Sequence, residues 1–177
     1  AYSAMSADIQ RFKEMDREIL SYLHNMNRCT LRIMGGPHAT YFTEILKEMN
    51  LDAICIGEGD NAIVQIIKNY KEGGGFEDIP NVLCHSNYEN GLQNKELIND
   101  LDSLPFADND SIFDAVPYYR TVQLRSFLTS RGCPYKCSYC HNDGFNKEFK
   151  GLGPIVRRCS IDRVIDEIKY TREKYPP

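Results

Sequence analysis

Short apolar runs that end at glycine alternate with stretches of helical periodicity in the first half of the chain. One run, residues 31–34, ends at Gly35-Gly36-Pro37, and a second, residues 52–56, ends at Gly57-Glu58-Gly59-Asp60. Runs of this length and composition are typical of buried strands, and glycine pairs are typical of the turns that follow them. Strands that alternate with amphipathic helices form a parallel sheet covered by helices. The sequence therefore predicts an α/β fold for this half.

Apolar residues recur at helical spacing in four segments, which we predict to be helices: residues 7–24, 42–49, 63–70 and 160–170. Ser6, Thr40 and Ser160 precede three of them and are placed to cap their first turns. Gly73-Gly74-Gly75 follows the third helix and is expected to end it.

Further strands are predicted later in the chain. Residues 81–85 and 93–97 have strand composition and are separated by Asn90-Gly91, which favours a hairpin turn. Residues 122–129 are predicted to form a strand that leads into a cysteine-rich loop. These boundaries indicate two modules and a linker: residues 1–97, a linker at 98–120 without clean periodicity, and residues 121–177.

The composition is that of a globular protein and excludes several classes of function. Of the 177 residues, 42% are hydrophobic and 26% charged, and the net charge is −4. No sustained Lys/Arg run is present, so we expect no nucleic-acid partner. The apolar runs are far shorter than the roughly 20 residues of a membrane span. With no secretory signal in the sequence, we expect a cytoplasmic protein that acts on a small molecule. Because the chain does not open with Met, we expect its natural N-terminus to lie upstream.

Seven cysteines are present, and six of them divide into two kinds. Cys29, Cys55 and Cys84 lie in apolar stretches and are predicted to be buried small hydrophobic residues. Cys133, Cys137 and Cys140 fall within eight residues of loop-like sequence. In a reducing compartment, such a cluster indicates metal or redox chemistry rather than structural disulfides.

The spacing Cys-x3-Cys-x2-Cys favours an iron–sulfur cluster. Thiolates are soft ligands suited to iron–sulfur clusters and zinc. Three thiolates can hold three irons of a cubane, which leaves the fourth iron open to a small molecule. A zinc site that adds His141 is a less favoured alternative, since zinc ligands come mostly from two separated pairs. The c-type haem pattern Cys137-Ser-Tyr-Cys140-His141 and a thioredoxin-like pair both leave a cysteine unexplained.

The segment Ser130-Arg-Gly-Cys-Pro-Tyr-Lys-Cys-Ser-Tyr-Cys140 resembles the cluster-binding signature of radical S-adenosylmethionine (SAM) enzymes. The resemblance implies a [4Fe–4S] cluster on Cys133, Cys137 and Cys140, with SAM bound at the open iron. One electron, from a donor such as flavodoxin or ferredoxin, would cleave SAM to a 5′-deoxyadenosyl radical. Tyr139 would lie against the adenine, and Gly132 would let the loop turn around the cluster. The loop would follow the first strand of a partial (β/α)6 barrel.

Motifs in the front half resemble one subgroup, the radical SAM enzymes with an N-terminal cobalamin-binding domain, which includes the anaerobic magnesium-protoporphyrin IX monomethyl ester oxidative cyclases. They are Ser3-Ala4-Met5, Gly35-Gly36-Pro37-His38-Ala39-Thr40, Gly57-Glu58-Gly59-Asp60 and Asp100-Leu-Asp-Ser-Leu-Pro-Phe106. The resemblance implies that Ser3, Met5 (in place of the usual Leu), Gly35 and Gly36 accommodate the nucleotide tail of cobalamin. Glycines at a strand end let a bulky ligand approach the backbone.

The resemblance implies part of a Rossmann-like, cobalamin-binding parallel sheet, a linker, and the first strand–loop–helix unit of the barrel. An Asp-x-His-x-x-Gly element is absent, so we expect an internal fragment of a longer enzyme that does not turn over alone. The parent would be an oxidoreductase or methyltransferase that performs methyl transfer or oxidative cyclisation, with a tetrapyrrole as one possible substrate. The alternatives are a radical SAM methylthiotransferase and a non-catalytic metal- or corrinoid-binding module. No catalytic residue is assigned.

Overall fold

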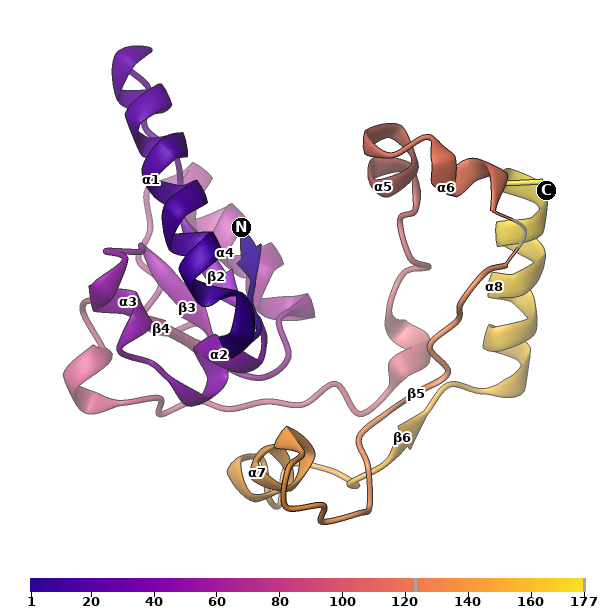
Figure 1. Cartoon of the computed structure of the whole chain (residues 1–177). Coiled ribbons are helices and arrows are strands. Elements are labelled where there is room, and N and C mark those ends of the chain that lie inside the picture. The colour runs from indigo at the N-terminus through magenta and orange to yellow at the C-terminus, as the bar shows by residue number, and fades with distance from the viewer. Residues whose placement is uncertain (123, 177) are drawn as a thin grey trace. The chain divides into compact units, whose positions relative to one another are not determined.

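The computed structural model describes residues 1–122 and 124–176. The chain divides into two compact units, Ala1–Leu97 (unit 1) and a second that begins at Ile98 (unit 2) (Figure 1). Each unit has its own sheet. No helix in the described residues combines the length and the apolar character needed to cross a membrane.

Unit 1 is built on a four-stranded sheet whose strands lie in chain order: β1 (Tyr2–Ser3), β2 (Ile33–Gly35), β3 (Ala53–Cys55) and β4 (Val82–Cys84). The first three strands are parallel, as the alternation of strands and helices predicts. β4 runs antiparallel to β3 at the edge, so the sheet is mixed. The parallel register places Ser3 opposite Gly35, at the carboxyl ends of β1 and β2.

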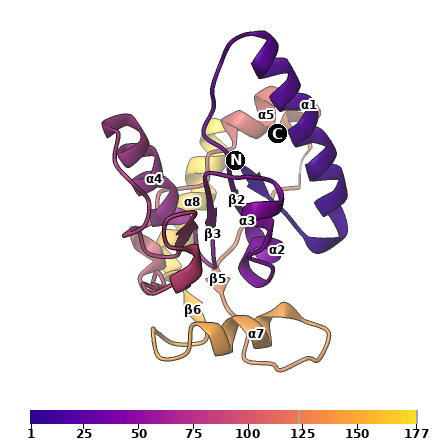
Figure 2. The same cartoon turned by 90° about the vertical axis from the view of Figure 1, so that its left-hand side faces the viewer.

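Helices cover the sheet of unit 1: η1 (Ser6–Asp8), α1 (Ile9–Asn25), α2 (Gly36–Tyr41), α3 (Ile45–Glu48), α4 (Asp60–Glu72) and η2 (Tyr88–Asn90). Figure 2 shows β2 and β3 between α4 and α1. α4 buries Ala62 and Ile66 in the core, which also contains Ile33, Ala53 and Val82. The helix ends where predicted, because Gly73 adopts a left-handed conformation (φ 75°).

Three local predictions in unit 1 are wrong. Ser6 does not cap α1, which begins after Asp8; its hydroxyl instead lies 3.0 Å from His38 Nδ1. The helix predicted at 42–49 is the short α3, and Thr40 belongs to the preceding α2. Residues 93–97 form no strand. The backbone N–H and C=O of Glu96, which would pair with a neighbouring strand, are hydrogen-bonded instead to the side-chain amide of Asn81.

The described residues of unit 2 form five helical segments and a two-stranded sheet: η3 (Leu101–Ser103), α5 (Asp110–Ala115), α6 (Tyr118–Thr121), β5 (Ser130–Arg131), α7 (His141–Glu148), β6 (Arg157–Arg158) and α8 (Ile161–Lys174). Ser160 caps α8 as predicted, since its hydroxyl accepts a hydrogen bond from Arg163 N at 3.1 Å. Residues 98–120 pack along α8, where Phe106 contacts Tyr170 and Phe113 contacts Tyr175. The division into residues 1–97, 98–120 and 121–177 stays a prediction.

The strand predicted at 122–129 is not found. Residue 123 lies outside the described residues, and residues 122 and 124–129 have no strand structure. Among the described residues that precede the cysteine loop in unit 2, the only strand is β5, which pairs antiparallel with β6. The backbone N–H and C=O groups of a strand need hydrogen-bond partners on a neighbouring strand. In the described part of unit 2, β6 supplies these partners to β5 alone, and the adjoining Cys159 N donates one further hydrogen bond, to Thr129 O. The strand–loop–helix unit of a barrel therefore stays a prediction.

Candidate functional sites

The three clustered cysteines lie on the loop between β5 and α7 (Figure 1). All three thiols are free and partly exposed. Cys140 N donates a hydrogen bond to Cys137 O at 3.1 Å, which closes a turn immediately before α7. The loop thus carries three soft donors, of which Cys140 is the N-cap residue of α7 and lies at the positive end of a helix dipole, an environment that favours an anionic group.

The loop fits a thiolate-bound cluster by the chemistry of its donors rather than by an assembled ligand set. Within residues 1–122 and 124–176, no three His, Cys, Asp or Glu side chains are arranged to hold a metal ion. The assignment of Cys133, Cys137 and Cys140 as ligands therefore stays a prediction. Asn142 Nδ2 lies 3.4 Å from Cys140 Sγ and can donate to a thiolate there.

Gly132 is required by the fold of the loop itself. Its φ is +90°, a conformation that side-chain-bearing residues rarely adopt, and a Cβ atom at this position would lie 1.8 Å from Ile155 O. The chain therefore passes against residue 155 just before Cys133. This contact accounts for the glycine without a cofactor, and its predicted role around a cluster remains a prediction.

Asn146, which the sequence analysis did not single out, anchors the cysteine loop to α7. Its Nδ2 donates a hydrogen bond to Cys133 O at 2.9 Å across thirteen residues of chain. Its signal in the sequence is weak, because an Asn in a helix usually faces solvent. Tyr139 is the most exposed aromatic residue noted in this loop, with 91% of its surface accessible. Its ring is free to stack on a planar ligand, and the adenine contact stays a prediction.

In unit 1 the structure brings together three of the four predicted corrinoid-contacting residues. Ser3 and Gly35 are register partners, and Gly36 follows directly. Gly36 has φ +88°, and a Cβ atom there would lie 2.9 Å from Ala4 N, so this glycine serves the close approach of β1. Met5 follows β1 and is half exposed (52%). Contact of these four residues with a corrinoid stays a prediction.

An apolar cavity of about 150 Å³ opens beside Gly35. Its lining includes Tyr2, Ile33, Met34, Gly35, Cys55 and Gly59. Burial raises the pKa of the Cys55 thiol from 9.0 to about 11, so the thiol stays protonated at neutral pH. The almost wholly apolar lining suits an uncharged group better than a charged one. Of the cysteines predicted to be buried, Cys84 is buried, Cys55 is partly so, and Cys29 is exposed, which corrects the prediction for Cys29.

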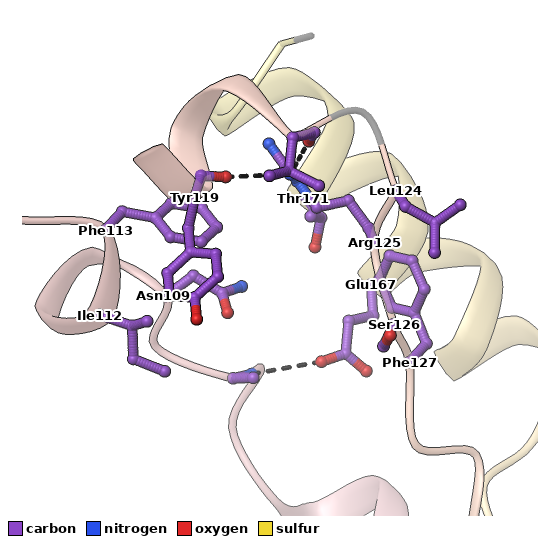
Figure 3. A pocket seen from close by; sticks show the side chains of 12 residues that line it. Asn109, Ile112, Phe113, Tyr119, Leu124, Arg125, Ser126, Phe127, Glu167 and Thr171 are labelled. Atoms are coloured by element: carbon purple, nitrogen blue, oxygen red, sulfur yellow. Dashed lines mark hydrogen bonds between the residues drawn. The ribbon is translucent and has the colours of Figure 1, made fainter. Parts of the chain in front are cut away.

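A second cavity, of about 260 Å³, lies within unit 2 (Figure 3). Its polar side chains mainly serve the backbone. Arg125 donates to the carbonyl oxygens of Tyr119 and Arg120 at 3.1 Å each, and Glu167 Oε1 accepts from Ala107 N at 3.2 Å. These bonds tie Arg125 to residues 119–120 and α8 to residue 107, while Arg125 Nε is buried without a hydrogen-bond partner among the described residues.

Comparison with known sequences finds curated relatives but no matching family model. An uncharacterized methyltransferase of Pyrococcus horikoshii is 29% identical over 160 residues, which cover 85% of this chain and 32% of that protein. The anaerobic magnesium-protoporphyrin IX monomethyl ester cyclase of Cereibacter sphaeroides is 26% identical over 151 residues, 77% of this chain and 24% of the cyclase. A putative methylthiotransferase of Methanocaldococcus jannaschii is 25% identical over 155 residues. The chain thus spans about a third or less of the length of these relatives.

Two solved structures share the fold. The cobalamin-dependent SAM radical enzyme OxsB, solved with aqua-cobalamin and SAM bound, superposes over 99% of this chain and 23% of its own, with a TM-score of 0.69 and 19% identity. The radical SAM methyltransferase TsrM of Kitasatospora setae superposes over 94% of this chain and 31% of the TsrM chain, with a TM-score of 0.62 and 19% identity. The resemblance predicted from the motifs is therefore confirmed: this chain is similar in fold to radical SAM enzymes, one of them cobalamin-dependent, and in sequence to a methyltransferase and to anaerobic magnesium-protoporphyrin IX monomethyl ester cyclases.

Proposed function

We propose that this chain is part of a cobalamin-dependent radical SAM enzyme, in which unit 1 binds the corrinoid and the cysteine loop of unit 2 holds a [4Fe–4S] cluster. The observation that carries the proposal is the placement of three free thiols on one loop, between a glycine-constrained turn and the start of α7. The named similarity to OxsB and TsrM supports it. A small-molecule substrate follows from the same comparison.

Each residue of the cysteine loop would have a distinct role in binding the cluster or SAM. A cluster held by the three thiolates would keep one iron free for SAM and would supply one electron for its reductive cleavage to methionine and a 5′-deoxyadenosyl radical. Cys133, Cys137 and Cys140 bind the irons, while Gly132 and Asn146 fix the start of the loop. Tyr139, with its ring exposed, stacks on the adenine of SAM. A flavodoxin or ferredoxin delivers the electron.

In unit 1 we propose that the nucleotide tail of cobalamin occupies the apolar cavity beside Gly35. Ser3 and Gly36 border this edge of the sheet, and Met5 offers an exposed apolar side chain next to it. The carboxyl ends of parallel strands are the usual position of ligands in α/β folds. The parent reaction is then methyl transfer or oxidative cyclisation, in line with one relative described as a methyltransferase and another described as a cyclase. The free thiols favour a reducing compartment, the cytoplasm.

A methylthiotransferase is the second candidate, because one relative is described in that way. Such an enzyme carries a second cluster, which needs three further thiolates. In unit 1, Cys29 is exposed, while Cys55 and Cys84 lie on neighbouring strands among apolar residues. Within the described residues no three His, Cys, Asp or Glu side chains are arranged to hold a metal, the cysteine loop included, so this absence does not separate the two candidates. The iron content separates the two candidates, since one cubane contributes about four irons and two contribute about eight.

Anaerobic reconstitution of the chain with iron and sulfide tests the proposal. We expect about four irons and four sulfides per chain and an absorption spectrum that each single Cys→Ala change at 133, 137 or 140 abolishes. Cys29→Ala is the matched control, since Cys29 is an exposed thiol outside the loop, and it should load normally. Binding of about one zinc in place of iron, or normal loading by the loop variants, would overturn the cluster assignment.

A further inference from the structure

The loop between β3 and α4, Gly57-Glu58-Gly59, borders the apolar cavity in unit 1 through Gly59. Gly57 has φ +81°, so the backbone turns sharply there. Gly59 lines the cavity directly, and a Cβ atom added at this position would lie 3.4 Å from Cys55 Sγ. Because Gly59 is part of the lining, a shift of this loop moves one side of the cavity.

The hydroxyl of Thr40 ties this loop to the turn that follows β2. Thr40 Oγ1 accepts a hydrogen bond from Gly57 N at 3.0 Å and donates one to Gly36 O, also at 3.0 Å. One side chain of α2 therefore joins the two glycine turns at the edge of the sheet. Neither bond is expected from the sequence, where Thr40 has the position of a helix cap.

Asn81 holds the same loop from the other side. It is buried (1% exposed) in a left-handed conformation (φ 63°), which Asn tolerates better than most residues. Its Nδ2 donates to Glu58 O and Glu96 O at 3.0 Å each, and its Oδ1 accepts from Glu96 N at 3.0 Å. Cys55 Sγ lies 3.5 Å from the same Glu58 carbonyl. A buried amide with all its groups satisfied makes a rigid support.

We infer that Thr40 and Asn81 are positioning residues that hold the Gly57–Gly59 loop at the width at which the cavity admits the nucleotide base of a corrinoid tail. The inference rests on the proposed corrinoid function of unit 1. Neither side chain lines the cavity, so each acts through the loop backbone. They select for corrinoids that carry a base and contribute little to binding of the corrin ring itself.

The test compares hydroxocobalamin with cobinamide, a corrinoid that lacks the nucleotide tail, on the 177-residue chain. Thr40→Val removes the hydroxyl with little change in shape, and Thr40→Ser is the control that keeps it. We expect Thr40→Val to bind hydroxocobalamin about tenfold more weakly, the effect of about one lost hydrogen bond to the loop. Binding of cobinamide should be unchanged, and Thr40→Ser should behave as the unchanged chain.

A second variant and a ligand-free readout keep the test decisive. Asn81→Gly preserves the left-handed backbone and should show the same selective loss, and in both variants hydrogen exchange at the Gly57 amide should be faster. Equal weakening of both corrinoids, unchanged binding of hydroxocobalamin, or loss of the fold in both variants would overturn the positioning role. If the unchanged chain binds neither corrinoid, the corrinoid function itself is wrong, and this inference fails with it.

Discussion

The side-chain amide of Asn146 and the backbone carbonyl of Cys133 are joined by a hydrogen bond of 2.9 Å. The bond connects the second turn of α7 with the first of the three clustered cysteines. Since Cys140 directly precedes the same helix, both ends of the cysteine loop are attached to α7. The helix therefore sets the span over which the three thiols can converge.

Replacement of Asn146 should weaken cluster assembly without unfolding unit 2. Asn146→Ala removes the anchor of Cys133, so a cluster ligand would have to be ordered when the cluster binds, at a cost of about 1 kcal/mol. We expect lower iron content after reconstitution and faster iron loss to a chelator. Lys147→Ala is the control, because the side chain of Lys147 is exposed and forms an ion pair with Asp143 that should contribute little to stability. Equal iron retention in both variants would contradict the anchoring role.

Gly132 and Gly151 form a matched pair that separates backbone strain from steric clash. Both have left-handed φ values, +90° and +89°, but a Cβ atom at Gly151 meets nothing within 4 Å. Gly151→Ala should cost only the strain of about 1–2 kcal/mol. Gly132→Ala should cost several kcal/mol more, because its Cβ would overlap Ile155 O. Urea unfolding followed by hydrogen exchange in unit 2 measures the difference, and equal losses would contradict the account.

Asp16 and Arg32 form the most buried ion pair described in unit 1, with 5% and 11% of their side chains exposed and a separation of 2.7 Å. Tyr2 Oη also donates to Asp16, at 2.8 Å. Asp16→Ala leaves the guanidinium buried without its carboxylate, and we expect a loss of about 3–5 kcal/mol in the free energy of unfolding. Lys13→Ala, at the more exposed pair with Glu48, should cost under about 1 kcal/mol. Hydrogen exchange in urea reports both values, and similar losses would contradict the burial argument.

The raised pKa of Cys55 predicts a loss of stability in alkaline solution. The folded thiol holds its proton up to about pH 11, while an unfolded one releases it near 9.0. Since the folded state then binds more protons than the unfolded state, the stability of unit 1 falls from about pH 9 and levels off near pH 11, by about 3 kcal/mol in total. The difference in the free energy of unfolding between the unchanged chain and Cys55→Ala, measured in urea at a series of pH values, should decrease over the same pH range. A difference that does not vary with pH would contradict it.

The sequence predicted the elements whose signal is local. The helices α1, α4 and α8 and the strands β2 and β3 lie where apolar spacing and glycine turns put them. The short helix α2 was missed, because Gly36-Pro37 has the composition of a turn, although proline is also favoured in the first turn of a helix. Cys29 was misplaced, because an apolar neighbourhood in sequence does not by itself bury a residue.

Strand pairing and side-chain hydrogen bonds between residues far apart in the chain could not be predicted. Residues 124–129 have strand composition, but a strand forms only beside another strand, and sequence pattern does not supply one. The supports of the candidate sites, Thr40, Asn81 and Asn146, act through hydrogen bonds to backbone far away in the chain. Asn81 offers one usable signal, since an Asn just before a strand is a candidate for a left-handed conformation. The three clustered cysteines were evident from spacing alone.

The most direct test of the central claim is the electron paramagnetic resonance spectrum of the reduced, reconstituted chain with and without SAM. If three thiolates hold a cubane with one open iron, the reduced cluster gives a signal that shifts when SAM is added. The same addition should leave the spectrum unchanged in a chain whose cluster has no open iron. A reduced cluster whose signal is insensitive to SAM would contradict the account.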